Sequence, residues 1–181
     1  MSDFNFELIY KLRDDEDPET YIESLYGAGC DDAMIEIGTP GHVTLEYLID
    51  SENFQRTFID AIKNVKRAIP HAKLQRIEPY RLNSSELAYY FGFSKQNMRK
   101  YISGQSSVKE PFPEPSIPGK TSYWYLLEVA IWFNKNTEYK LDKQHFNALK
   151  MIVILNREIE RSLFDFNELE EKECVDALQC A

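Results

Sequence analysis

The chain has 181 residues, of which 43% are hydrophobic and 13% aromatic, a composition typical of a globular rather than a disordered protein. The formal net charge of −9 argues at first against nucleic-acid binding, because phosphate contacts supply much of its affinity. No apolar run approaches the ~20 residues of a membrane span and no signal peptide precedes Phe4, so we expect a cytoplasmic protein. Three scattered cysteines form no CxxC pair and predict free thiols; redox sensing by Cys174 and Cys180 is a less favoured alternative.

The charge is distributed unevenly along the chain. Residues 1–80 hold 8 Lys and Arg against 16 Asp and Glu, and residues 137–181 hold 6 against 10. Residues 81–136 hold 7 against 4 and are the only basic third. Acidic flanks of this kind suppress indiscriminate DNA binding and orient the single basic face.

Residues 1–79 are predicted to form an α/β domain with the element order β-α-β-β-α-β. Strand alternation, helical periodicity and Gly or Pro breaks support this order. The predicted elements are Phe4–Leu12, Pro18–Tyr26, Ala33–Ile37, His42–Ile49, Asn53–Ile69 and Lys73–Ile77. The order is typical of a ferredoxin-like split βαβ sandwich, although the sequence leaves the strand pairing open.

We expect this domain to serve dimerisation, or to bind a partner protein or a small ligand. RNA binding is a weaker alternative, because it requires exposed aromatic residues and a positive surface, whereas this segment is acidic. The run Asp14–Asp17 is more simply a solvated turn than a cation site, since it lacks the spaced ligand loop of calcium sites.

The stretch Leu82–Ile102 predicts a helix, a tight turn and a second helix. Asn83, Ser84 or Ser85 can cap the first helix, which covers roughly Glu86–Phe91. Gly92 supplies a positive φ that ends it, and Ser94 caps a second helix over about Lys95–Ser103.

The second helix directs Met98, Tyr101 and Ile102 inward and a polar set outward. Gln and Asn pair with adenine, Arg with guanine, and Lys or Ser hold phosphate, so the polar set predicts a DNA-reading helix. The alternative is a structural helical hairpin with a solvated polar face. The candidate DNA-binding residues on this helix are Ser94, Lys95, Gln96, Asn97, Arg99, Lys100 and Ser103.

A proline-dense loop follows, and it is predicted to be extended and stiff. Its end, Gly119–Ser122, is expected to lay Lys120 and Ser122 along a phosphate strand, unless the loop is a plain linker. Trp124 and Trp132 are then predicted to lie on one face of a single helix and to pack in the core.

Residues 82–133 resemble the winged helix-turn-helix modules of phage excisionases and their MerR-type relatives. The matching residues are Ser85-Glu86-Leu87-Ala88, Phe91-Gly92-Phe93-Ser94, Phe112-Pro113, Pro115, Trp124 and Glu128-Val129 with Trp132. The resemblance implies a DNA-binding domain over residues 80–136, with the second helix in the major groove and the wing on the backbone. Base reading by Lys95, Gln96, Asn97 and Arg99 is likewise implied by the resemblance.

Residues 137–181 predict a long amphipathic helix followed by an acidic tail. The helix runs from a cap at Asp142 to about Phe164, and its apolar stripe must be buried on the same chain or on a second copy. We expect a homodimer with this helix as its dimerisation element, because two half-sites lengthen the sequence that is read. The tail Asn167–Ala181 is expected to fray, with one last helical turn near Val175 and Leu178 as an alternative.

These patterns together predict a sequence-specific double-stranded DNA-binding protein, a bacterial or phage transcription regulator. The alternative is an accessory subunit, such as an antitoxin, whose acidic N-terminal domain binds a partner protein. No enzyme, cofactor or metal site is expected: His42, His71 and His145 lack nucleophiles or ligands at motif spacing, and no Walker, HExxH or GxSxG motif occurs.

Overall fold

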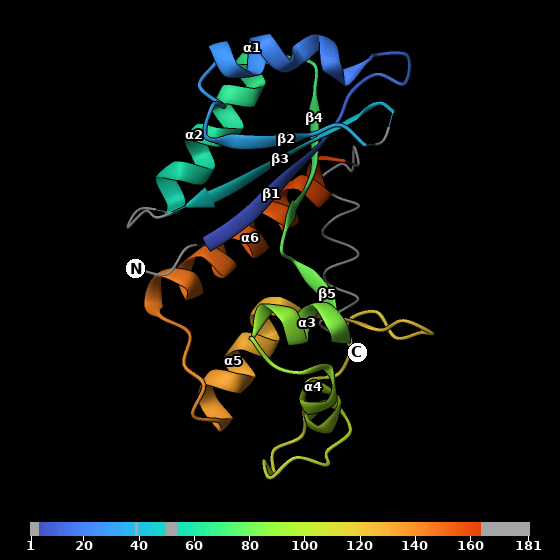
Figure 1. Ribbon diagram of the computed structural model, residues 1–181, viewed down its shortest axis with the longest axis vertical. Coiled ribbons are helices and arrows are strands. Elements are labelled where there is room, and N and C mark those ends of the chain that lie inside the picture. Colours follow the sequence, from blue (N-terminus) through green and yellow to red (C-terminus); the bar gives the residue numbers. More distant parts are fainter. Residues whose placement is uncertain (1–3, 39, 50–53, 164–181) are drawn as a thin grey trace, which may run out of the picture.

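A four-stranded antiparallel sheet forms the N-terminal part of the protein. The computed structural model describes residues 4–38, 40–49 and 54–163, and its α+β architecture adds helices, a two-stranded sheet and a long C-terminal helix (Figure 1). The sheet order, which the sequence left open, is β2-β3-β1-β4. The strands are β1 (Phe4–Lys11), β2 (Ala33–Glu36), β3 (His42–Ile49) and β4 (Lys73–Glu78).

The alternation of the strands gives the sheet one buried and one open face. Phe6 of β1 is fully buried, and its ring packs 4.3 Å from that of Phe58. Phe58 belongs to α2 (Phe54–Ala68), which covers the buried face. The first predicted helix divides into the 3-10 turn η1 (Pro18–Tyr21) and α1 (Ile22–Gly27), and Asn53, the predicted start of α2, lies outside the described residues.

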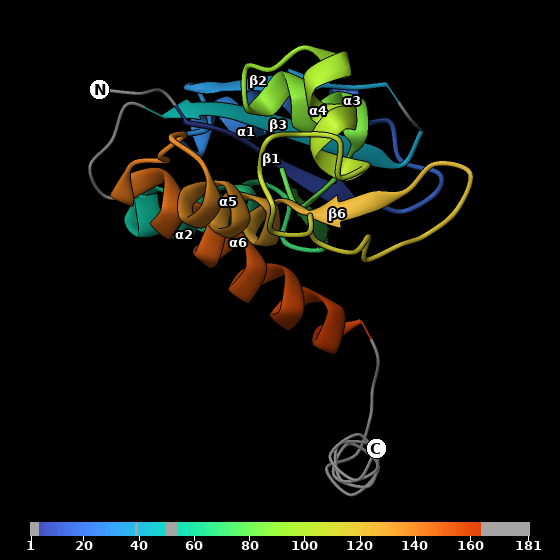
Figure 2. The ribbon, with the colours of Figure 1, turned by 90° about the horizontal axis from the view of Figure 1, so that it is seen from below.

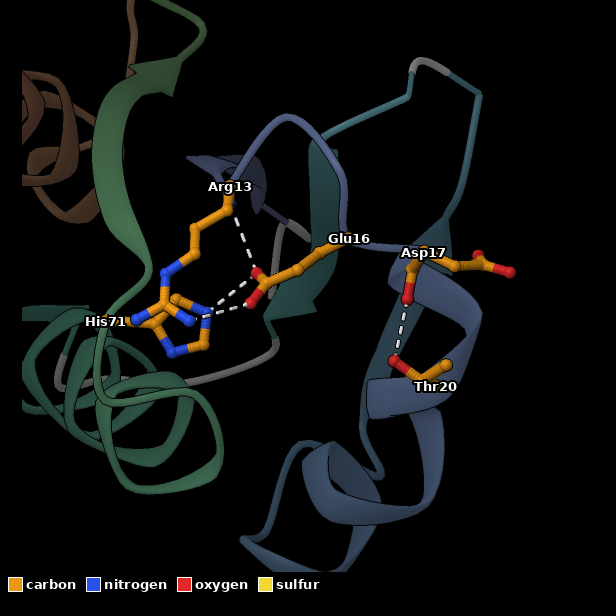
Figure 3. Close-up of polar contacts among 5 residues, drawn as sticks. All are labelled: Arg13, Glu16, Asp17, Thr20 and His71. Atoms are coloured by element: carbon orange, nitrogen blue, oxygen red, sulfur yellow. Dashed lines mark hydrogen bonds and ion pairs between the residues drawn. The ribbon is translucent and has the colours of Figure 1, made fainter.

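The acidic turn after β1 is held by its neighbours, and Figure 3 shows how. Glu16 accepts a 2.7 Å hydrogen bond from His71 and a 3.2 Å bond from the Arg13 backbone N–H. Asp17 caps η1 through a 3.0 Å bond from the Glu19 N–H, and its carbonyl accepts the Thr20 hydroxyl at 2.7 Å. The carboxylates of this turn therefore serve the fold.

The structure contains a second, two-stranded sheet, and its strand β6 lies where the sequence predicted the start of a helix. β5 (Arg81–Asn83) pairs with β6 (Tyr123–Tyr125), and Leu82 lies opposite Trp124. The prediction that Trp124 and Trp132 share one helix is wrong, because α5 (Leu126–Asn136) begins after Trp124. Three consecutive aromatic residues favour the extended strand, and the β5 ladder fixes it there.

The two helices predicted after Leu82 are α3 (Ser84–Tyr90) and α4 (Lys95–Ile102). Their inward residues Leu87, Ala88 and Met98 are buried. Figure 1 shows α3, α4 and α5 together beyond the end of the four-stranded sheet, and Figure 2 shows the same molecule from below.

Helix α6 (Lys143–Ser162) packs against β4, α5 and α2. Asp142 caps it, as predicted, by accepting the His145 N–H at 2.9 Å. Its apolar stripe is buried within its own chain, at Ala148, Leu149, Ile152 and Ile159.

Asn156 of α6 closes the outer edge of the sheet. It is 2% exposed, and its side-chain amide accepts the Ile77 N–H at 2.9 Å and donates to the Ile77 carbonyl at 2.8 Å. These backbone groups face away from β1, where a free sheet edge would otherwise need a pairing strand.

Several predictions fall outside the described residues: the helix end near Phe164, the tail Asn167–Ala181 and the Cys174/Cys180 pair. Cys30 is a buried free thiol. Within the part that the structure describes, no helix combines the length and apolarity needed to cross a bilayer.

Candidate nucleic-acid interface

Helix α3 starts with a capping box that fixes its direction. Of the three residues able to cap it, Asn83 does so: its carboxamide oxygen accepts the N–H groups of Ser85 at 2.9 Å and Glu86 at 3.1 Å. The Glu86 carboxylate in turn accepts a 2.8 Å hydrogen bond from the Asn83 N–H. Because Asn83 also ends β5, the cap joins the two-stranded sheet to α3.

The turn between α3 and α4 has the predicted chemistry. Gly92 adopts φ +68°, a left-handed conformation that glycine reaches without the steric cost of a side chain. Ser94 caps α4 by accepting the Asn97 N–H at 3.1 Å. The four residues from Phe91 to Ser94 therefore set the angle between the helices.

Aromatic side chains pack against the inward side of α4 and hold the helix in place. Phe93 and Tyr101 lie 5.8 Å apart between ring centroids, and Phe133 of α5 lies 5.2 and 5.1 Å from them. Met98 is fully buried in the same core. Since its inward side is held rigidly, α4 presents a fixed outward face.

That outward face is polar and open. Lys95, Gln96, Arg99, Lys100 and Ser103 are exposed, and Asn97 is half-buried. At 1.5 Å per residue, the eight residues of α4 span about 12 Å.

A groove of about 800 Å³ lies between α4, the start of α3 and the loop before β6. Six of the nine predicted DNA-binding residues line it: Gln96, Arg99, Lys100, Ser103, Lys120 and Ser122. The remaining lining residues are Asn83, Ser84, Ser85, Ile102, Gln105, Thr121 and Trp124. No lining residue is acidic, so Arg99, Lys100 and Lys120 give the groove a positive charge.

The other three predicted residues lie elsewhere. Ser94 serves as the cap, Lys95 lines a second groove on the far side of α3, and Asn97 lines neither. The sequence reading missed Gln105, placed Thr121 in the loop expected along a phosphate strand without naming it a site residue, and assigned Ser85 only a capping role. The sequence signal for Thr121 was the turn Gly119–Ser122, which hydrogen bonds between Gly119 and Ser122 close. Lys120 and Thr121 of this turn line the groove beside α4.

Two tryptophans attach the proline-rich loop to the core. The indole N–H of Trp124 donates to the Pro113 carbonyl at 2.9 Å, and that of Trp132 donates to the Pro111 carbonyl at 2.7 Å. Phe112 packs between them, with its ring 5.0 Å from Trp132. The loop that follows α4 is thus built into the aromatic core of α3, α4 and α5.

Arg81 is a cation that serves the fold and does not line the groove beside α4. Its guanidinium lies 4.8 and 4.7 Å from the rings of Tyr80 and Tyr125, donates to the Tyr125 hydroxyl at 2.8 Å and stands 3.6 Å from Glu160. Burial would lower the pKa of Arg81, but these partners outweigh it and raise the pKa. Arg81 therefore remains charged and ties the two-stranded sheet to α6.

Among the residues that the structure describes, no three His, Cys, Asp or Glu side chains are grouped to hold a metal ion. The arrangement instead offers positive charge and hydrogen-bonding side chains in one groove. Compared with protein-family models, curated proteins and solved structures, the chain matches none of them.

Proposed function

We propose that the protein binds double-stranded DNA in a sequence-specific manner, as a bacterial or phage transcription regulator that inserts α4 into the major groove. The observation that carries the proposal is the groove beside α4, in which Gln96, Arg99 and Lys120 come together with no acidic neighbour. A helix with its side chains is about 10–12 Å across, which suits a major groove about 12 Å wide. Base edges select the site and phosphate contacts hold the register.

The finer fold assignment belongs to this proposal. The β-α-β-β-α-β order with the sheet order β2-β3-β1-β4 supports a ferredoxin-like domain over residues 1–79. The pair α3 and α4, with β5, β6 and the loop between them, supports a winged helix-turn-helix over residues 80–136. The resemblance to excisionase and MerR-type modules is in keeping with this arrangement.

A homodimer on two half-sites remains part of the proposal. The residues of α6 that are buried in their own chain, such as Leu149 and Ile152, are not available for a dimer contact. If α6 serves dimerisation, the contact uses its exposed residues.

The test is a measurement of affinity for a duplex selected from random sequences. The double variant Asn97→Ala/Arg99→Ala is compared with Arg157→Ala, which removes a positive charge from an exposed position on α6. We expect the double variant to lose at least about 1 kcal/mol of specific affinity by fluorescence anisotropy, and the control to lose almost none. A loss below that value, or an equal loss in the control, contradicts α4 as the reading helix.

An accessory subunit is the second candidate. The carboxylates of Glu7, Glu46 and Glu78 on the open face of the sheet favour it. These side chains lie on the sheet and not in the groove beside α4, so the two functions are compatible in one chain. An enzyme is not part of the proposal.

A further inference from the structure

Three glutamates lie side by side across the open face of the sheet. Glu7 of β1 is directly opposite Glu46 of β3 on one side and Glu78 of β4 on the other. Directly opposed side chains on neighbouring strands are about 5 Å apart at their Cβ atoms, and like charges so placed destabilise a sheet. These three residues are called the glutamate row.

The glutamates at the two ends of the row have hydrogen-bond or ion-pair partners within the protein, and the central glutamate does not. Glu46 accepts a hydrogen bond from Asn5, and Glu78 forms a 2.6 Å ion pair with Arg76. Glu7 has no hydrogen bond or ion pair with any described residue. Partial burial first, and then the charges of Glu46 and Glu78, raise the pKa of Glu7. Arg76 offsets this charge in part by lowering the pKa of Glu7, and the three glutamates of the row retain a net negative charge.

Apolar side chains stand beside this charge. Met34 continues the row on β2, opposite Glu46, and is 63% exposed. Leu48, two residues further along β3, is 67% exposed. The alternation of the strands places both on the open face, where nothing within the described chain covers them.

Helix α3 forms a wall at one end of the glutamate row. A groove of about 1240 Å³ is lined by Glu7 and Glu78 from the sheet and by Glu86 and Tyr89 from α3. The cations Arg76, Arg81 and Lys95 also line it; Arg76 is paired with Glu78, and Arg81 is held by Tyr125 and Glu160. Tyr89 is 91% exposed, although aromatic rings of this size dominate core and interface energetics.

We propose that this face, the glutamate row with Met34, Leu48 and Tyr89, binds a segment of another protein that carries Lys or Arg among apolar side chains. Cationic side chains would neutralise the row, and apolar ones would cover Met34, Leu48 and Tyr89. The inference is independent of the DNA-binding proposal, because none of these residues lines the groove beside α4.

Other occupants fit the face less well. A duplex is repelled by the carboxylates. Residues 164–181 of the chain hold six Asp or Glu and one Lys, so they too are repelled. The basic groove beside α4 of a second copy has suitable charge, but its apolar lining is limited to Ile102 and Trp124, which leaves Met34 and Leu48 uncovered.

The experiment is a selection of short random peptides displayed against the full chain, with Glu7→Gln/Glu46→Gln as the counter-target. The matched control is Glu19→Gln/Glu23→Gln, which removes the same charge from exposed positions on η1 and α1. We expect the selected peptides to be rich in Lys or Arg alternating with apolar residues. A synthetic peptide of this kind should bind the wild type and the control alike, and the Glu7→Gln/Glu46→Gln variant at least about tenfold more weakly.

Three outcomes overturn the proposal. In the first, the selected peptides lack basic residues; in the second, they bind all three proteins equally well. In the third, the wild type associates with itself in a salt-sensitive manner that Glu7→Gln/Glu46→Gln abolishes, which would make a second copy the occupant. Circular dichroism of the variants excludes misfolding as a cause of weak binding, and their affinity for the selected duplex separates this result from the test of DNA binding.

Discussion

The open sheet face and the groove beside α4 carry opposite charge, and the fold builds them differently. The glutamate row comes from three strands that pairing brings into register, whereas the positive charge of the groove comes from one helix and one loop. The row has like charges close together, and the groove has cations spread among neutral polar residues. A net charge of −9 therefore says little about either surface, because the two are separated on the molecule.

The largest expected effect comes from the contact through which α6 fixes the sheet edge. Asn156→Leu removes both partners of the Ile77 backbone, and leaving these buried groups unsatisfied should lower the free energy of unfolding by roughly 2–4 kcal/mol. Urea denaturation measures the change. Asn147→Leu, an exposed position on the same helix, should change it by less than about 0.5 kcal/mol. Similar losses in the two variants would mean that the edge contact contributes little.

The next effect concerns the basic surface alone. Lys120→Ala should weaken binding to all duplexes by less than about tenfold and reduce the slope of log affinity against log salt by about one. Lys63→Ala, at an exposed position of α2, removes the same charge and should leave the affinity and the salt slope unchanged. Duplex binding is measured at several salt concentrations. An unchanged salt slope in Lys120→Ala would show that Lys120 does not contact a phosphate.

A smaller effect is expected at the centre of the glutamate row. Glu7→Gln should raise the free energy of unfolding at neutral pH by about 0.2–1 kcal/mol, because it relieves repulsion from Glu46 and Glu78. The pKa of Glu7 is raised in the folded protein, so the native state holds this proton more tightly, and the wild type loses stability as pH rises through the raised pKa. The variant should lack that loss. Coincident pH profiles from urea denaturation would show that the row is not strained.

The smallest effect should appear at the turn after β1, with the opposite sign. Burial raises the pKa of Glu16, but hydrogen bonds from His71 and Arg13 outweigh it, and the net pKa is lowered. Glu16 therefore stabilises the fold above the usual pKa of a glutamate, and this stabilisation is lost as pH falls through the lowered value.

His71→Ala should move the pKa of Glu16 back towards the usual value, as measured by NMR titration of the carboxyl carbon. His42→Ala serves as the control, since the ring of His42 hydrogen-bonds the nearby Pro40 carbonyl and is not a partner of Glu16. An unchanged Glu16 titration would remove His71 as the cause.

Much of the fold could be predicted because the signals are local. The alternation of β1 and β3, the periodicity of α2 and the caps at Ser94 and Asp142 each depend on a few neighbouring residues. The outward residues of α4 could be read in the same way, because helical spacing assigns them to one face.

The remainder depends on contacts between distant parts of the chain. β5 and β6 have three residues each and pair across about forty positions, so neither carries a recognisable signal alone. For the same reason Trp124 was placed in a helix. The glutamate row was invisible, because Glu7, Glu46 and Glu78 become neighbours only once the strand order and register are known. Helical spacing places Asn156 on the apolar side of α6, and only the position of Ile77 explains an amide there.

The two indole hydrogen bonds to the proline-rich loop give the chain a built-in optical reporter. Trp124 and Trp132 are its only tryptophans, and each donates to a carbonyl of the Glu110–Pro115 segment. The tryptophan emission of the native protein, selected by excitation at the red edge of the indole band, thus originates beside the loop that borders α4. Movement of that loop can be followed in unlabelled material.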